Sequence, residues 1–432
     1  MSTSLIILSS LVIALGIIPF LKPNLTFQYP LVVGMFLSVW LLPQAWAIER
    51  DGLAGAFDAG PAWTYMTLCV AFLVFGYFGG RATSRQRMLA KRDEISAQYN
   101  EKRMTHASIA LLAVGVVSSL LMSQAQEKVE NATMWTGVIT LYALLAQCLV
   151  FAAALTFLIY LRTRSKTALI LFIIASATFS PVLLFAVKRE FIFQFAMIIV
   201  CGLYLVRGLV PSRFILLSAC FIGAFIVNNT GSIRSYIKTN DTSLVGALTS
   251  SDFFDTEDRE ANTPKAPEIL GAVTDISIAA DQGVYHPFRS IYNGAIWRYF
   301  PAFIFGREAK DRLTIKDDQD VLSNRYFTLG ATRTGFSDTF IDFWYLGVLG
   351  FAFLGFFFGI VFELAAAGSL RGQYMYVSML GTGIHGITHA FQEFVCTLPF
   401  LLLVVWLPFR YARITPKERQ KLSKLMGARQ NS

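Results

Sequence analysis

The chain has 432 residues, of which 55% are apolar and only 15% carry a charge, and its mean hydropathy is +0.53. Soluble globular domains are about 25% charged, so this composition predicts an integral membrane protein. It excludes a soluble enzyme, a nucleic-acid-binding module and a secreted disulfide scaffold. The formal net charge of +9 must first be sorted by side of the membrane, because much of it carries topology information.

Apolar runs follow one another along most of the chain. A helix needs about 20 apolar residues to cross a bilayer. The first run, residues 4–21, has no basic residue before it and no small-residue cleavage site after it, so we expect a retained span rather than a signal peptide. Eleven spans are predicted, at residues 4–21, 28–48, 63–80, 106–123, 135–161, 167–187, 191–206, 214–228, 341–362, 374–391 and 397–412. The expected fold class is an all-α polytopic integral membrane protein with one large loop.

Basic residues fall on alternate connections between these spans. The connection at residues 81–103 carries seven Lys and Arg residues, and the positive-inside rule places so basic a short loop in the cytoplasm. Alternation then places the amino terminus outside and the carboxyl terminus inside. The short loops assigned to the outer face hold only Arg50, Lys128, Lys188 and Arg189, and this asymmetry supports a count near eleven.

This topology divides the chain into four parts. They are spans one to eight at residues 1–228, a large periplasmic loop at 229–340, spans nine to eleven at 341–412, and a basic cytoplasmic tail at 413–432. Within the loop, residues 290–305 are rich in Tyr, Trp and Phe, are too short to cross the bilayer, and contain Pro301. This pattern predicts an interfacial helix that tethers the loop to the outer leaflet.

Cations at the outer ends of two spans are candidates for binding an anion. Lys188 and Arg189 lie on the side where the positive-inside rule disfavours cations. A pyrophosphate would suit them, because arginine offers a planar fork and lysine a point charge. Alternatively, Glu190 pairs with one of them in a short turn. Arg234, beside a Gly-Ser turn after the eighth span, could help to cradle a phosphate or could snorkel from a span end.

Further cations in the large loop alternate with aromatic residues. Arg289 and Arg333 could extend an anion site, and aromatic side chains could cover the apolar faces of sugar rings. The aromatic candidates are Tyr285, Trp297 and Tyr326. The same mixture is ordinary for a belt of residues at a membrane interface, so both interpretations stay open.

Histidines offer candidates for proton transfer. His286 is the one histidine in the large loop, and an imidazole there could act as a general base for a sugar hydroxyl, although a single loop histidine is more often incidental. His385 and His389 share a helix face with Glu393, which could mimic a metal site. The zinc-protease pattern is not met, because glycine follows His385. We therefore expect interhelical hydrogen bonds there.

The stretch that opens the ninth span combines acids with spaced glycines. Asp338 and Asp342 are four residues apart and lie on one helix face, where like charges repel. We expect a cationic partner for the pair, or one protonated member. Gly347, Gly350 and Gly355 follow and would let another backbone approach closely.

This stretch resembles the oligosaccharide repeat-unit polymerases of the O-antigen polymerase (Wzy) type. In that family a glycine, a serine and an acidic residue precede an aromatic element that begins the span after a large periplasmic loop, and spaced glycines follow. The residues in those places are Gly335, Ser337, Asp338, Asp342, Phe343 and Gly347. Arg189 and Arg234 are similar to the family's arginines at outer span ends, and residues 296–305 resemble its aromatic-proline element.

The resemblance implies a membrane glycosyltransferase of the bacterial inner membrane with its active site facing the periplasm. Such a polymerase transfers a growing glycan from polyprenyl pyrophosphate to the next lipid-linked repeat unit, in O-antigen lipopolysaccharide, exopolysaccharide or capsule biosynthesis. The implied partners are undecaprenyl-pyrophosphate-linked glycans, membrane lipids and a chain-length-regulating co-polymerase, with no nucleic acid.

Roles follow for the residues singled out above. The candidates for holding the pyrophosphate are Lys188, Arg189, Arg234, Arg289 and Arg333. The candidates for accepting the proton of the acceptor hydroxyl are Asp338, Asp342 and His286. The candidates for contacting sugars are Tyr285, Trp297 and Tyr326. No nucleotide-binding glycine motif or convincing metal cluster is present in the sequence, so we expect metal-independent chemistry and no cofactor.

Two alternatives stay open. An O-antigen ligase, which moves a finished glycan onto a lipid A core, shares the donor and the fold type. A transporter of lipid-linked oligosaccharides would want ionisable residues along several spans, whereas here they concentrate at the outer boundary, with Glu363 and Glu393 the evident exceptions.

Overall fold

The computed structural model describes residues 2–54, 57–90, 99–124, 138–184, 189–225, 267–283, 286–315 and 334–414. These ranges are helical and contain no β-strand, with one isolated bridge between Tyr99 and Arg413. Seven of the described helical segments are long and apolar enough to cross a membrane, and two of them, Val138–Thr163 and Gly335–Ala366, each combine two of the helices named below. An all-α, membrane-embedded protein is thereby confirmed, and the count of eleven spans stays a prediction.

Helices occupy each region where the hydropathy predicts a span. Before the large loop they are α1 (Thr3–Leu21), α2 (Tyr29–Arg50), α3 (Gly60–Ala90), α5 (Glu101–Gln124), α6 (Val138–Ala146), α7 (Cys148–Thr163), α8 (Lys166–Leu184), α9 (Arg189–Arg207) and a helix at Arg213–Phe225. After it they are α18 (Gly335–Phe343), α19 (Val348–Ala366), α20 (Leu370–Thr388) and α21 (Phe391–Ala412). Short 3-10 turns lie at Pro23–Leu25 and Trp344–Gly347.

Two predicted spans differ from the helices found. The span expected at 135–161 is divided into α6 and α7 at Gln147. The span expected at 341–362 begins earlier, at Gly335, and is interrupted at Trp344, whose φ of 55° lies in the left-handed region. A left-handed residue of this size is rare in regular helix, so α18 and α19 are separate helices.

Small residues hold α3 and α19 together at the centre of the bundle. A side chain on Gly76 or Gly80 would overlap the backbone of α19 at Ala352 or Phe356. A side chain on Gly355 would likewise overlap the backbone of α3. Backbones in membranes approach this closely only where both helices present small residues. The prediction of a close backbone approach is confirmed for Gly355 and, against Thr339, for Gly347. It is wrong for Gly350, which lies against the ring of Phe391.

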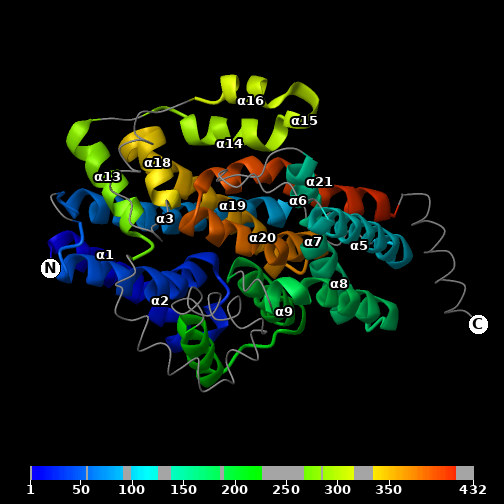
Figure 1. Ribbon diagram of the computed structural model, residues 1–432. Coiled ribbons are helices and arrows are strands. Elements are labelled where there is room, and N and C mark those ends of the chain that lie inside the picture. Colours follow the sequence, from blue (N-terminus) through cyan, green and yellow to red (C-terminus); the bar gives the residue numbers. More distant parts are fainter. Residues whose placement is uncertain are drawn as a thin grey trace, which may run out of the picture.

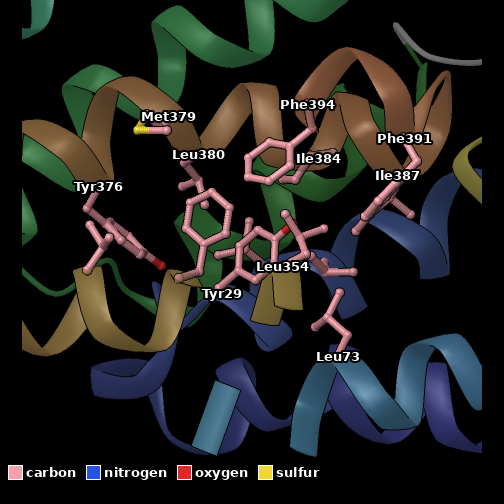
Figure 2. Packing of buried hydrophobic residues seen from close by; sticks show 14 of the residues in the cluster. Tyr29, Leu73, Leu354, Tyr376, Met379, Leu380, Ile384, Ile387, Phe391 and Phe394 are labelled. Atoms are coloured by element: carbon pink, nitrogen blue, oxygen red, sulfur yellow. The ribbon is translucent and has the colours of Figure 1, made fainter. Parts of the chain in front are cut away.

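Aromatic side chains fill the space between α2, α19, α20 and α21 (Figure 2). The rings of Tyr29 and Phe358 stack with centroids 4.0 Å apart, and the Tyr29 hydroxyl donates to the carbonyl of Gly383 at 3.0 Å. Because a buried hydroxyl without a partner is costly, this bond fixes α2 against α20. Tyr376 and Phe394 extend the same cluster.

Hydrogen bonds between helix ends define two ends of the bundle. At the first, here named the Glu49 end, the Glu49 carboxylate accepts from the Ser2 amide at 2.5 Å and from the Trp63 indole at 3.2 Å. At the other, the Asn24 end, the Tyr204 hydroxyl donates to the Asn24 carbonyl at 2.6 Å. Arg162 donates to the Gly368 carbonyl at 2.6 Å, and the Asn100 amide to the Ala412 carbonyl at 2.9 Å.

The described part of the large loop is helical and packs on the bundle (Figure 1). Its helices are α13 (Leu270–Gln282), α14 (Arg289–Tyr299), α15 (Ala302–Phe305) and α16 (Arg307–Leu313). The expected interfacial helix at 290–305 is present as α14 and α15, separated at Pro301. Its predicted tie to the outer leaflet stays a prediction. Helix α13 was not anticipated, and it packs against α3 and α18.

Candidate functional site

The short helix α18 lies at the Glu49 end and is buried along its whole length except at its last residue. The Ser337 hydroxyl accepts from the Thr334 amide at 3.1 Å and starts the helix. Gly335 lies against the backbone of α20 at Gly386, and Tyr65 of α3 donates to the Thr339 hydroxyl at 2.9 Å. Contacts with α3 and α20 therefore set the position of the acids that α18 carries.

Asp342 attaches the large loop to α18. Its carboxylate accepts the backbone amide of Ser290 at 2.9 and 3.1 Å and that of Ile291 at 3.3 Å. These amides are in the first turn of α14, where helix N–H groups lack partners within the helix and a negative charge is favourable. The His286 amide adds a bond to the Ile341 carbonyl at 2.9 Å. Asp342 thus caps α14, a role that the sequence did not suggest.

A cation accompanies this acid. The positive charge of Arg289 favours the ionised form of Asp342. The two residues are only 4% and 2% exposed. The expected cationic partner of the acidic pair is therefore present. Asp338 lies one turn earlier on α18 and is also buried. The structure brings His286, Arg289, Asp338 and Asp342 together where α14 meets α18, whereas their catalytic and binding roles stay predictions.

Trp297 lies on the opposite end of α14 and contacts a buried lysine. The ammonium of Lys310 donates to the Trp297 carbonyl at 2.9 Å and lies 4.6 Å from the centre of its indole ring. Burial lowers the pKa of the Lys310 side chain from its ordinary value. This contact ties α16 to the last turn of α14. Lys310 was missed because it lies in a charged stretch that has the composition of a solvated surface.

A second polar cluster lies where α20 meets α21, close to the start of α18. Nε2 of His385 is 3.0 Å from Oε2 of Glu393, and the rings of His385 and His389 stack at 4.4 Å. This confirms the expected interhelical hydrogen bond. Arg298 of α14 donates to the Glu393 carbonyl at 3.3 Å, so α14 reaches both polar clusters. Among the described residues, no group of three or more His, Cys, Asp or Glu side chains is arranged to hold a metal ion.

A carboxylate of the loop also reaches into the bundle. Glu268, just before α13, accepts from the Trp40 indole at 3.1 Å, and the Ile269 amide donates to Gln44 at 3.2 Å. Both partners belong to α2. The loop is therefore fixed to α2 and to α18, and its described helices form part of the Glu49 end.

Several predicted site residues lie outside the described residues. They are Lys188, Arg234, Arg333, Tyr285 and Tyr326. Arg189 is described as the first residue of α9, and its side-chain position is not. The anion-binding roles proposed for these cations stay predictions from the sequence.

Comparison with protein-family models, with curated proteins and with solved structures finds no match for this chain. The resemblance to repeat-unit polymerases therefore rests on the residues quoted from the sequence. The geometry by itself defines a helical membrane protein in which loop helices and membrane helices bring acids, histidines and arginines together at one end of the bundle.

Proposed function

We propose that this chain is a polysaccharide polymerase of the bacterial inner membrane, which joins undecaprenyl-pyrophosphate-linked oligosaccharide repeat units on the periplasmic face. In this proposal the chain crosses the membrane eleven times and the Glu49 end faces the periplasm. The observation that carries the proposal is the attachment of α14 to α18 through Asp342. That attachment holds a histidine and an arginine of the loop beside two acids of a membrane helix.

The orientation draws support from the positions of the basic residues. Arg81, Arg162, Arg207 and Arg371 belong to segments that the charge pattern assigns to the cytoplasm. The hydrogen bond of Arg162 lies at the Asn24 end. So does the hydrogen bond of Tyr204, which is three residues before Arg207 on α9. The hydrogen bonds at the Asn24 end thus join segments that the alternation of basic loops assigns to the cytoplasm. The opposite end, the Glu49 end, is then assigned to the periplasm.

The chemistry of the cluster suits glycosyl transfer from a lipid-linked donor. Such a donor already carries pyrophosphate as its leaving group, so the protein must hold two substrates in position and offset the charge that develops on the phosphate. Arginines can offset the charge on the phosphate. A proton acceptor can take the proton of the hydroxyl that attacks. Both kinds of group occur in the clusters at the Glu49 end.

The test is chain growth by the purified protein. We expect the wild-type chain in proteoliposomes to convert a lipid-linked repeat unit into a ladder of longer glycans. Arg189→Ala and Arg234→Ala should abolish the ladder and leave folded protein, because each would remove a cation from the leaving group. Arg50→Ala is the matched control, since Arg50 is exposed and pairs with Asp51.

Other outcomes would assign other functions. A ladder of wild-type intensity from both arginine variants would remove these residues from the site. Transfer of the glycan only to a lipid A core would identify a ligase. Movement of the substrate across the bilayer without chain growth would identify a transporter.

A further inference from the structure

We propose that the carboxylate of Glu393, held by His385, accepts the proton of the acceptor hydroxyl when the glycosidic bond forms. The inference rests on the proposed polymerase function. It assigns proton transfer to a residue other than the three that the sequence favoured for it. The geometry of α20, α21 and α14 at the Glu49 end leads to this assignment.

Glu393 lies in the first turn of α21 with one oxygen fixed and the other available. An ionised carboxylate can only accept hydrogen bonds, so Nε2–H of His385 donates to Oε2 across the 3.0 Å contact. The Glu393 side chain is 47% exposed, against 15% for His385. Oε1 has no hydrogen-bond partner among the described residues. A hydroxyl group could therefore reach Oε1 while His385 keeps the carboxylate in place.

The groups around Glu393 are basic. The charged or titratable side chains that act on it are His385 and His389 from α20 and Arg298 from α14. Arg298 also donates to the Glu393 carbonyl at 3.3 Å, which brings a guanidinium group to the same turn. Three potential cations favour the ionised form of this one acid, and the ionised form is the one that can accept a proton. The same cations can offset charge that develops on a nearby leaving group.

The two acids that the sequence favoured for proton transfer are less accessible than Glu393. Both oxygens of Asp342 accept backbone amides of α14, and Asp342 is 2% exposed. Asp338 is 6% exposed. A substrate would have to displace α14 to reach Asp342, whereas Glu393 is reached from outside. The Asp342 and Glu393 sites are both joined to α14, at Ser290 and Arg298, roughly 12 Å apart along the helix axis.

The proposed step balances in atoms and charge. The acceptor oxygen attacks the anomeric carbon of the donor glycan, and its proton passes to Oε1 of Glu393. The bond between that carbon and the phosphate oxygen breaks, and polyprenyl pyrophosphate leaves with the electron pair. Glu393 then releases the proton to water, and the new glycosidic bond joins the two glycans.

The experiment uses the full chain in proteoliposomes. The probe is the undecaprenyl-pyrophosphate-linked repeat unit that accumulates in source cells when this chain is deleted. Glu393→Gln keeps the size of the side chain and should lower the rate of chain growth by at least about 100-fold, the scale of general-base catalysis. Glu393→Ala should recover activity when formate is added, because a small carboxylate can occupy the vacated position. The thermal unfolding temperatures of both variants should match that of the wild type.

His385 is a positioning residue in this proposal, and its test is the pH profile. His385→Gln retains an N–H donor and should keep most of the activity. His385→Leu removes the donor, so the ionised carboxylate is less favoured and the acidic limb of the rate profile should move to higher pH. An unchanged limb in His385→Leu would contradict its role.

The outcomes separate the inference from the proposed function. A wild-type chain that builds no ladder overturns the polymerase function and the inference with it. A normal wild-type ladder together with Glu393→Gln activity within about threefold of wild type overturns the inference alone. Loss of activity that follows loss of folded protein, without rescue by formate, would assign Glu393 a structural role and overturn it as well.

Discussion

The two ends of the bundle use charged residues in different ways. At the Asn24 end, Arg81 of α3 contacts Glu363 of α19 at 2.5 Å and Gln28 at 3.2 Å. Its guanidinium group also lies over the rings of Tyr77 and Phe362, 5.7 and 5.5 Å from their centres. At the Glu49 end, Glu393 keeps one carboxylate oxygen without a partner among the described residues, and Arg298, His385 and His389 act on it electrostatically.

The difference separates charges that stabilise from charges that are available for chemistry. Arg81 and Glu363 are 29% and 14% exposed and are bound to each other, so removing either would leave the other partly buried without its partner. Glu363, an exception to the concentration of charges at the outer boundary, therefore has a structural explanation. The interpretation of Glu393 as a second buried exception is wrong, because its side chain is 47% exposed at the Glu49 end. Only one of its carboxylate oxygens is bound.

The largest expected effect on stability is at the Asn24 end. Arg81→Ala should lower the free energy of unfolding by about 3 kcal/mol, because it strands Glu363 among apolar neighbours. Replacing both residues, as Arg81→Met with Glu363→Leu, should recover most of the loss. Thermal unfolding in detergent measures the change, and Arg50→Ala, in an exposed pair, should cost less than about 0.5 kcal/mol. Equal losses for Arg81→Ala and Arg50→Ala would erase the distinction between the two kinds of pair.

A smaller effect is expected where Asp342 caps α14. Asparagine caps helices about as well as aspartate, whereas alanine costs about 1 kcal/mol. Asp342→Asn should therefore keep α14 attached, and Asp342→Ala should accelerate hydrogen exchange at the Ser290 and Ile291 amides. Chain growth should survive in Asp342→Asn and fall in Asp342→Ala. If Asp342→Asn is as inactive as Asp342→Ala while the amides stay protected, Asp342 itself performs the chemistry. Its carboxylate would then belong with the charges that are available for chemistry.

The sequence predicts features that depend on neighbouring residues and misses those that depend on distant ones. Hydropathy is local, so the apolar runs and the break at Pro301 indicate where helices lie. The bond between His385 and Glu393 was also expected, because one helix face and a short connection bring them together.

Long-range pairings carry no comparable local signal. Gly355 indicated a close helix contact, but nothing near it identifies α3 as the partner. The positive φ of Trp344 interrupts a run that is predicted as one apolar span, so hydropathy gives no sign of it. The cap that Asp342 provides joins residues far apart in the chain, so the spacing of Asp338 and Asp342 predicted a cationic partner but not the bond to α14.

The proposed function requires the Glu49 end to face outward, and site-directed labelling tests this directly. Gln282→Cys places a thiol at the exposed end of α13, and Arg371→Cys places one at the Asn24 end. Four of the five native cysteines are buried, and Cys220→Ser would remove the fifth. We expect a membrane-impermeant maleimide to label residue 282 in intact spheroplasts, and residue 371 only after the membrane is opened. Labelling of residue 371 but not of residue 282 in intact spheroplasts would contradict a periplasmic site.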